Sequence, residues 1–297
     1  MKRRAFLKTA AAASVTSLLA PRLFAEPGAD PKAVLWVIQG TDIPAMLEKG
    51  MALAGGWSAY VKKGAKVTLK PNAAWASTPE QGGNTHPDLV RAFCAGAFKA
   101  GAASVTLPEI PCSPADQAFA MSGIEAAVQA AGARLYKPAR NDEFRTLAIP
   151  KGVAIQEALL AADVLDCDCL VNMPVAKTHG GATLTLSMKN WMGSEKNRSG
   201  WHRKNLHQCI ADLSTVLKPA LIVIDAIRIM TTNGPRGPGK LEFPNKLILG
   251  RDPVACDAYA ATLFGRKPFD IPHIRMAHDA GVGCGDLDRV KVVEAAV

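Results

Sequence analysis

Short apolar runs alternate along this 297-residue chain with segments that have the apolar periodicity of helices, and this alternation most limits its fold. Runs of that length predict strands, and the segments between them are long enough to form crossover helices. Such an order is typical of a mostly parallel sheet covered by helices on both faces. The sequence therefore predicts an α/β protein, built as one large domain or as two interlocked lobes.

Apolar periodicity, proline and glycine place the individual elements. Pro87 in a first turn and Gly101 just beyond a last turn bound one helix clearly. No repeat or low-complexity linker divides the chain, so we expect residues 26–297 to form a single α/β unit. The expected strands are 32–38, 67–70, 104–107, 133–136, 168–173, 220–226, 246–250 and 290–293, and the expected helices are 45–60, 87–100, 113–132, 154–162, 206–217 and 253–265.

The N-terminal residues carry an export pattern. Paired Arg3 and Arg4 precede a weakly apolar run over residues 9–20, which is shorter than the about 20 residues that a membrane-spanning helix needs. This combination is typical of a twin-arginine signal peptide. We expect cleavage after Ala25, so that residues 1–25 are the signal and the twin-arginine (Tat) translocation machinery is a partner. The protein is then expected to act in the periplasm or another exported compartment, without a permanent membrane anchor.

The positive net charge does not indicate a nucleic-acid partner. The formal charge is +9, but residues 1–25 hold five of the 35 bases and none of the 26 acids. The remaining chain is therefore only weakly basic, and it has no stripe of Lys and Arg interleaved with aromatic residues. Nucleic-acid binding usually requires such a stripe, so no nucleic-acid partner is expected.

Cysteine spacing argues against two kinds of site. The seven cysteines are odd in number and scattered, and none forms a CxxC pair. A small disulfide scaffold and a ferredoxin-like cluster both need denser, regularly spaced cysteines. An iron–sulfur cluster is therefore not expected, while a divalent metal held by other side chains stays open.

Polar clusters follow four of the expected strands, directly after residues 70, 172, 225 and 250. The carboxyl ends of parallel strands meet at one edge of a sheet, and ligands bind outside that edge. We therefore expect these loops to meet, with Gly234 among the glycines that allow a ligand to approach the backbone closely. The side chains brought together would be Lys70, Asn72, Asn172, Lys177, His179, Asp225, Asn233 and Asp252.

The segment NMPVAKTHGGATLTLSMKNWMG, residues 172–193, points most strongly to function. Its lysines lie among small and apolar residues, where a lysine is rarely buried without an anionic partner. Lys177, His179 and Lys189 are the catalytic candidates, and His179 is the preferred general acid–base because an unperturbed histidine has a pKa near 6.5. The ligand-binding candidates are Lys70, Asn72, Asn172, Asn190, Asn233 and Gly234.

Structural interpretations exist for several of these residues. Asp252 before Pro253 fits a helix N-cap better than a catalytic acid, and Asp257 in the same helix fits a partner of a helix dipole. His86 before Pro87 fits a capping residue. His207 at the expected start of a helix is more typical of a core or capping histidine than of a ligand.

Collinear motifs along most of the chain resemble the bacterial and archaeal family with the domain of unknown function numbered 362. The resemblance implies an α/β fold. Some relatives carry an appended ferredoxin-like module and are labelled iron–sulfur proteins, but this chain has no CxxCxxC run, so that property is not carried over. A fainter likeness to the lactate-racemase type of nickel enzyme concerns only the general arrangement. The matching stretches are KPN (70–72), NTHPDLVRA (84–92), NMPVAKTH (172–179), SMKNWMG (187–193), VIDAI (223–227), NGPRGPG (233–239) and DPVACDA (252–258).

Three functions are consistent with these observations. The first is a protein that binds, and as an enzyme would transform, a small anionic molecule such as a carboxylate or phosphate ester; a divalent metal on His86, His179 and Asp225 is a variant of it. The second is a factor that holds a metal or redox cofactor for the maturation of an exported enzyme. The third is a structural or partner-binding domain whose polar loops are only well-capped turns.

Overall fold

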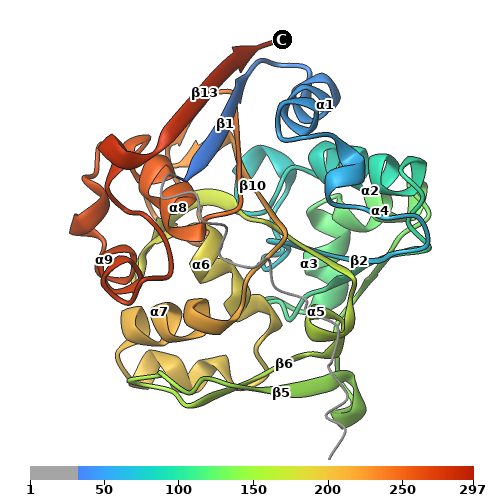
Figure 1. Cartoon of the computed structure of the whole chain (residues 1–297). Helices are drawn as coiled ribbons and strands as arrows, with labels where there is room; N and C mark the ends of the chain where they lie inside the picture. The colour runs from blue at the N-terminus through green and yellow to red at the C-terminus, as the bar shows by residue number, and fades with distance from the viewer. Residues whose placement is uncertain (1–32) are drawn as a thin grey trace, which may run out of the picture.

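The computed structural model describes residues 33–297, so the expected export signal lies outside the described residues. Its main sheet confirms the predicted α/β fold (Figure 1). All strands along this path run in one direction except β12, which is antiparallel to both of its neighbours. The strand order is β13 (Lys291–Ala296), β1 (Val34–Gln39), β12 (Lys246–Gly250), β10 (Leu221–Met230), β7 (Cys169–Met173), β2 (Lys66–Pro71), β3 (Ser104–Pro108) and β4 (Arg134–Tyr136).

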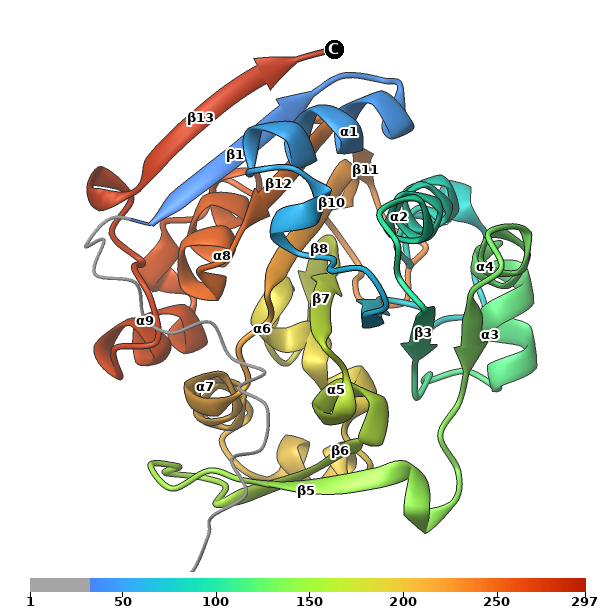
Figure 2. The same ribbon diagram turned by 45° about the vertical axis from the view of Figure 1, so that its right-hand side comes forward.

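Helices cover both faces of this sheet, as Figure 2 shows. Alternate residues of β10 point to opposite faces: Val223 packs against a first group of helices, and Ile222 and Ile224 pack against a second group on the other face. This two-residue period is expected of a strand buried on both sides. The first group is α1 (Ile43–Leu53), α2 (Pro87–Lys99), α3 (Ala115–Met121) and α4 (Ile124–Ala130); the second includes α6 (Ser187–Asn190), α7 (Leu206–Val216), α8 (Pro253–Thr262) and α9 (Pro272–Asp279).

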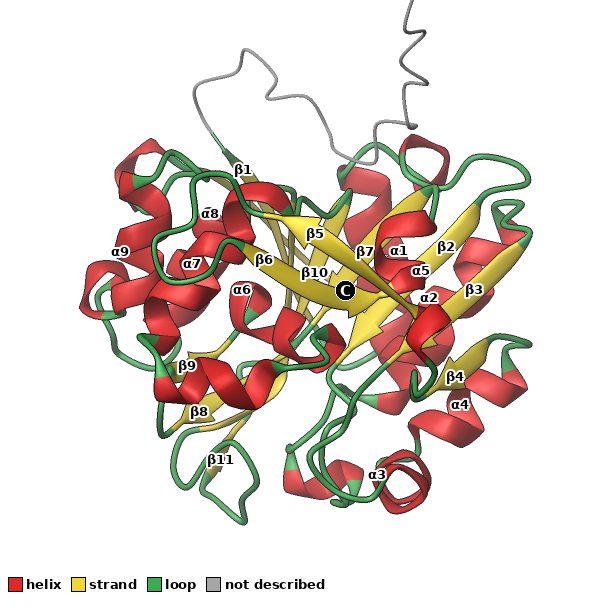
Figure 3. Cartoon of the chain, turned by 90° about the horizontal axis from the view of Figure 1, so that it is seen from below, coloured by secondary structure: helices red, strands yellow, loops and turns green. Residues whose placement is uncertain are grey.

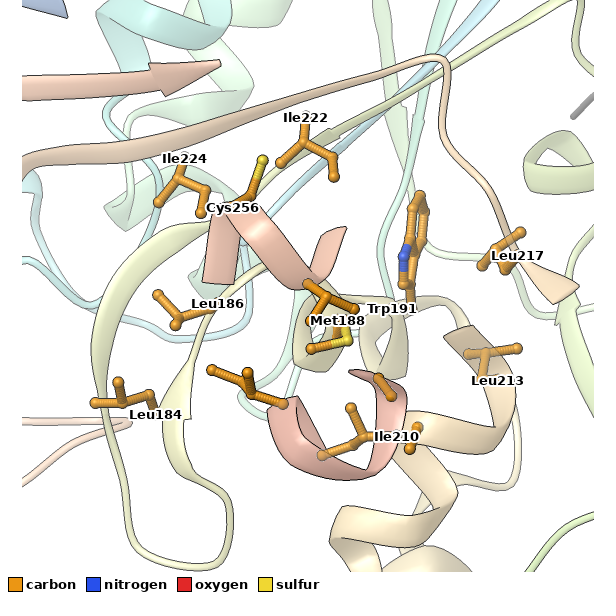
Figure 4. Close-up of a cluster of buried hydrophobic side chains, with 14 of the residues drawn as sticks. Leu184, Leu186, Met188, Trp191, Ile210, Leu213, Leu217, Ile222, Ile224 and Cys256 are labelled. Atoms are coloured by element: carbon orange, nitrogen blue, oxygen red, sulfur yellow. The ribbon is translucent and has the colours of Figure 1, made fainter. Parts of the chain in front are cut away.

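The second face holds a large apolar cluster that fixes the residues around the site (Figure 4). Met188 of α6 and Trp191 of the following 3-10 turn η4 (Trp191–Ser194) are buried in it, next to Ile210 of α7. Burying side chains of this size contributes about 2 kcal/mol each. The short segment that carries Lys189 and Asn190 is therefore held on the body of the protein by apolar anchors on both sides of it.

A ribbon of strands extends beyond the main sheet. β8 (Val175–His179) follows β7 after Pro174 and pairs with the second half of β10, and β9 (Thr183–Thr185) folds back on β8. The two-residue strand β11 (Leu241–Glu242) pairs with the end of β10. Residues 174–179, which the sequence suggested as a loop, thus form mostly a strand, and their side chains have fixed directions.

The expected helix over residues 154–162 is wrong. This region forms the strand β6 (Glu157–Ala161), which pairs with β5 (Phe144–Ala148) in a separate two-stranded sheet (Figure 3), followed by the short helix α5 (Ala162–Asp166). Ala158 and Leu160 are buried at two-residue spacing, which is the period of a strand. The expected helix 113–132 is two helices, because Gly123 between them has a φ of +71°.

Within residues 33–297, no helix has the length and apolar character needed to cross a membrane.

Candidate functional site

A cavity of about 200 Å³ lies where β2, β8 and β9 meet α6 and the 3-10 segments η4 and η5 (Arg198–Arg203). Its lining residues come from four separate stretches of the chain, within 72–75, 109–112, 177–202 and at 235, as expected for the carboxyl edge of a parallel sheet. Its lining residues are Asn72, Ala74, Trp75, Glu109, Cys112, Lys177, His179, Thr185, Lys189, Asn190, Met192, Gly193, Arg198, His202 and Pro235. The three catalytic candidates therefore share one cavity with two of the six ligand-binding candidates.

Lys177 lies on β8 with its side chain only 1% exposed. Its Nζ donates to Asn72 Oδ1 at 3.1 Å and to the carbonyl oxygen of Gly83. Both acceptors are neutral, so neither stabilises the charge of an ammonium as a carboxylate would. Burial, and secondarily the positive charge of Lys189, lowers the pKa of Lys177 to about 7. The lysine thus sits in the cavity wall with its protonated form disfavoured.

Lys189 is carried by α6, a helix of a single turn. Its side chain forms no hydrogen bond or ion pair with any residue in the described range 33–297. Burial lowers the pKa of Lys189 to about 8. This lysine therefore reaches the cavity as a cation to which the described protein offers no anionic partner.

His179 has one ring nitrogen occupied by the backbone. Its Nδ1 accepts from the amides of Gly181 and Ala182, each at 3.1 Å, so Nε2 carries the proton in the neutral ring. Burial, followed by the charges of Lys189 and Lys177, lowers the pKa of His179 to about 3. This shift disfavours a general acid–base role that depends on an ordinary histidine pKa, and the two amides on Nδ1 leave the Nε2–H of the neutral ring as the available donor.

Three asparagine side chains connect the cavity wall to the strands behind it. Asn72 donates to Asn190 Oδ1 at 3.1 Å, and Asn190 donates to Asn172 Oδ1 at 2.9 Å and to the carbonyl oxygen of Lys70 at 3.0 Å. Asn172 is fully buried and donates to the carbonyl oxygen of Ser187 at 2.8 Å. Asn72 and Asn190 thus face the cavity, while Asn172 positions them from behind.

Lys70 lies behind the cavity wall, outside the lining residues, in a buried ion pair. Its Nζ is 2.7 Å from Glu109 Oε2, and the same oxygen accepts from the amide of Ala73 at 2.9 Å. Burial lowers the pKa of Lys70, and Glu109 opposes that shift. The other oxygen, Glu109 Oε1, has no hydrogen-bond partner within the described chain, and neither has Thr185 Oγ1 in the same cavity wall.

Gly193 allows the backbone to approach this ion pair. A Cβ there would lie 2.2 Å from Glu109 Oε1 and 2.7 Å from Lys70 Nζ, which is far inside van der Waals contact. The glycine of the KNWMG motif is therefore explained by packing against the Lys70–Glu109 pair.

A buried carboxylate supports the turn that carries Lys189. Asp257 of α8 accepts from the amide and hydroxyl of Ser187, at 2.7 and 2.6 Å, and from the amide of Met188 at 3.1 Å. The expectation that Asp257 partners the dipole of its own helix is wrong, because α8 has no acid in its first turn and Asp257 accepts instead from the first amides of α6. Burial raises the pKa of Asp257 to about 7.

Two ligand-binding candidates have local roles outside the cavity lining. Asn233 is exposed and donates to the carbonyl oxygen of Pro238 at 3.3 Å within its own turn. Gly234 packs against β8, where a Cβ would lie 1.9 Å from the carbonyl oxygen of Thr178. The close backbone approach expected at Gly234 therefore occurs, but toward the chain itself, and it brings the next residue, Pro235, into the cavity wall.

Asp252 is not part of the site. β12 runs antiparallel to β10, so its carboxyl end lies at the opposite edge of the sheet from the cavity. Asp252 there caps α8 by accepting from the amides of Val254 and Ala255, at 2.8 and 3.0 Å. The expectation that all four strand-end loops meet is wrong for this loop, whereas the N-cap interpretation is confirmed.

The predicted metal ligands do not gather into a site. His86 is the N-cap of α2, and its backbone amide donates to Asp225 Oδ2 at 2.7 Å. Asp225 also accepts from the amide of Ile227 at 3.1 Å, so both of its oxygens have backbone donors. In residues 33–297 no three His, Cys, Asp or Glu side chains are grouped so that they could hold a metal ion. His86, Asp225 and His179 therefore do not form the proposed triad.

Several lining residues were missed from the sequence. Glu109 follows β3 directly, so the strand-end rule used for the other loops applies to it as well. Arg198 shows why others carried no signal: its guanidinium donates to the carbonyl oxygens of Ile110 and Pro111 and lies 3.4 Å from Cys112 Sγ. Such contacts join segments about ninety positions apart and leave no local pattern.

Known proteins share features with this chain. Residues 67–262 match the model of the family described as Domain of unknown function (DUF362). The thylakoid-associated protein sll1697 of Synechocystis sp. is 24% identical over 226 residues, which are 73% of this chain and 68% of that protein. Two solved structures resemble the fold at low identity.

The first is the lactate racemase apoprotein from Thermoanaerobacterium thermosaccharolyticum, with a TM-score of 0.43 and 13% identity over 65% of this chain and 50% of that one. The second is a protein from Thermotoga maritima, with a TM-score of 0.46 and 10% identity over 75% of this chain and 59% of that one. This chain thus spans about half of the racemase structure and under two thirds of the other.

Proposed function

The chain belongs to the family defined by the domain of unknown function DUF362, and we propose that it binds a small anionic molecule in the cavity between Lys177, Lys189 and His179. The supporting observation is that two lysines face this cavity without a carboxylate partner among the described residues: Lys177, which is buried, and Lys189, which is partly exposed. Glu109, the acid in the wall, is already paired with Lys70. A bound anion would supply the missing negative charge, and in a poorly solvated cavity that interaction is stronger than at the surface.

The neutral groups of the wall favour a carboxylate or a phosphate ester as the anion. In the neutral ring of His179 the Nε2–H is a donor, and Thr185 Oγ1 is a buried hydroxyl with no partner in residues 33–297. Trp75 and Met192 add an apolar part to the wall. A small molecule with one anionic end and a short carbon chain matches this mixture of donors and apolar surface.

Isothermal titration calorimetry with phosphate and with small carboxylates tests this function. Lys189→Met removes the cation that has no partner in the described structure, and we expect it to weaken binding at least about tenfold, because a charge-assisted hydrogen bond contributes roughly 1.5 to 3 kcal/mol.

Lys218→Met is the matched control. Lys218 also has a pKa lowered by burial, to about 8, but it donates to the carbonyl oxygens of Ser214 and Val282, outside the cavity lining. Its substitution should leave the affinity unchanged. If both variants bind as the wild type does, the cavity is not the anion site.

We also propose that the protein is exported by the twin-arginine route, on the basis of Arg3, Arg4 and the weakly apolar run after them. Changing both arginines to lysine keeps the charge but removes the pattern. In cell fractionation the double variant should accumulate uncleaved in the cytoplasm, while the wild type is found in the exported fraction. Equal distribution of the two proteins would contradict this proposal.

A further inference from the structure

The two lysines of the cavity are held differently. Lys189 has no hydrogen bond or ion pair in the described range, whereas Lys177 is fixed by Asn72 Oδ1 and the Gly83 carbonyl oxygen. Asn72 is in turn fixed by Asn190, which bonds to the backbone of β2 and to Asn172 of β7. The position of the Lys177 amine is therefore set by three strands of the sheet.

The bonding of the Lys177 nitrogen leaves one direction open. A lysine nitrogen is tetrahedral, with one position taken by Cε and three by hydrogens or a lone pair. Two hydrogens point to the two acceptors, so the fourth position on the nitrogen has no acceptor among the described residues. Lys177 is itself one of the residues that line the cavity. Because both acceptors are neutral, a neutral amine satisfies them fully and places its lone pair in that open position.

We propose that Lys177 is a nucleophilic amine and that the anion bound in the cavity is a small carboxylate bearing an aldehyde or ketone, which Lys177 captures as an imine. This inference rests on the proposed anion site and names its ligand class. Lys189 would hold the carboxylate, and the Nε2–H of His179 would donate to an oxygen of the ligand.

The pKa of about 7 for Lys177 supports this role, because a substantial fraction of the amine is unprotonated near neutral pH. Burial beside a second lysine is a known way to activate an amine for carbonyl capture.

The step is balanced without a further reactant. The unprotonated amine adds to the carbonyl carbon, and a proton moves from nitrogen to oxygen to give a carbinolamine. Loss of the hydroxyl group with one proton from solvent releases water and forms the protonated imine. Overall, the ammonium form of lysine and a carbonyl yield a protonated imine and water, so the positive charge beside the carboxylate is retained.

Reductive trapping tests the proposal directly. The full-length protein is incubated with pyruvate or glyoxylate and sodium cyanoborohydride near neutral pH, and adducts are located by peptide mass spectrometry. We expect one adduct per chain, at Lys177, with at least one of the two acids. Lys177→Met should abolish this adduct. In Lys189→Met the adduct should form more slowly, and a high concentration of the acid should restore its yield.

Binding of lactate separates the failure of this inference from that of the anion site. Lactate has the carboxylate of pyruvate but no carbonyl, so it measures anion binding alone. If lactate and pyruvate bind in the cavity but Lys177 is never trapped, the imine proposal is overturned and the anion site stands. If neither acid nor phosphate binds, both are overturned.

Competitive labelling gives a second measurement that does not depend on the choice of acid. Trace acetic anhydride at pH 7 modifies neutral amines, so Lys177 should be labelled several times faster than the surface lysines Lys62 and Lys99 in the same sample. Bound lactate should slow that labelling. Labelling of Lys177 at or below the rate of the surface lysines would overturn the assignment of a neutral, accessible amine.

Discussion

Charged side chains are taken out of water in two regions of the protein, and their hydrogen-bond partners differ between the two. On the side of the sheet covered by α7 and α8, Asp212 accepts from three consecutive amides, those of Val153, Ala154 and Ile155, at 2.6 to 3.0 Å. Asp257 has three donors as well. In the cavity, Lys177 has two neutral acceptors and Lys189 has none among the described residues.

The difference indicates which buried charges are structural. Backbone amides are available to a carboxylate wherever a helix or turn begins, so a buried acid can be satisfied within the chain. A buried lysine can donate to backbone carbonyl oxygens, as Lys177 does to that of Gly83, but these acceptors carry no full negative charge, so the ammonium form is less favourable there than beside a carboxylate. Lys70 lies between these two cases, because it is a buried lysine that has a carboxylate partner, Glu109.

Lys70→Met is expected to have the largest effect on stability. It leaves Glu109 buried and uncompensated, which should lower the free energy of unfolding by about 4 kcal/mol. The double variant Lys70→Met/Glu109→Met should recover at least half of that loss, and Lys177→Met should cost less than half of it. Urea denaturation measures all three. Equal losses for Lys70→Met and Lys177→Met would remove the distinction between the paired and unpaired lysines.

Asp257→Ala is expected to cost about 3 kcal/mol, because it leaves the two amides and the hydroxyl at the start of α6 without their acceptor. Asp257→Asn keeps one acceptor oxygen and should lose less. The same denaturation series measures both, and calorimetry with the anion should show weaker binding because α6 carries Lys189. Unchanged stability in Asp257→Ala would mean that the turn is held by its apolar anchors alone.

The pH dependence of stability should reveal Lys177. Its pKa is lowered in the folded protein, so the unfolded chain binds more protons between about pH 7 and 10, and stability rises with pH in that interval. This contribution is complete above the unfolded pKa and is lost as pH falls toward 7. Relative to Lys177→Met, the wild type should gain roughly 2 kcal/mol between pH 8 and pH 10. Parallel curves for the two proteins would show that Lys177 keeps an ordinary pKa.

Gly193→Ala should have the smallest effect of the series. The added methyl group meets Glu109 Oε1 and Lys70 Nζ, which are the ends of side chains and can move aside at a moderate cost. We expect a loss of about 1 kcal/mol from overpacking, measured by thermal denaturation. Gly200→Ala is the control, because a Cβ at Gly200 has no atom within 4 Å. An equal effect of the two substitutions would show that the ion pair yields easily.

The sequence predicted the fold class well because strand and helix periods are local. It could not show directly that β12 is reversed, since apolar runs have no direction. One indication was present: residues 231–245, between β10 and β12, contain Gly and Pro but no helical pattern. A parallel return usually requires a crossover helix, so the missing helix favoured an antiparallel neighbour. An antiparallel β12 ends at the opposite edge of the sheet, so the same indication predicts that Asp252 lies away from the site.

The site was predicted in part for a similar reason. Lys177, His179, Lys189, Asn72 and Asn190 were found because they stand out on an apolar background near strand ends. The separation of cavity-lining from supporting residues depends on side-chain partners that lie far away in sequence. The pairing of Lys70 with Glu109, 39 positions on, and the two amides on His179 Nδ1 have no sequence signature.

Helix α6 is too short to hold its own shape in water, because one turn of helix is unstable alone. Its placement comes from its apolar anchors Met188 and Trp191 and from Asp257 of α8, an alanine-rich helix that is absent from the cavity lining. A change of side-chain volume in α8 would therefore move Lys189 without altering any residue of the cavity lining. If the proposed anion binds there, substitutions in α8 should change its affinity from outside the cavity.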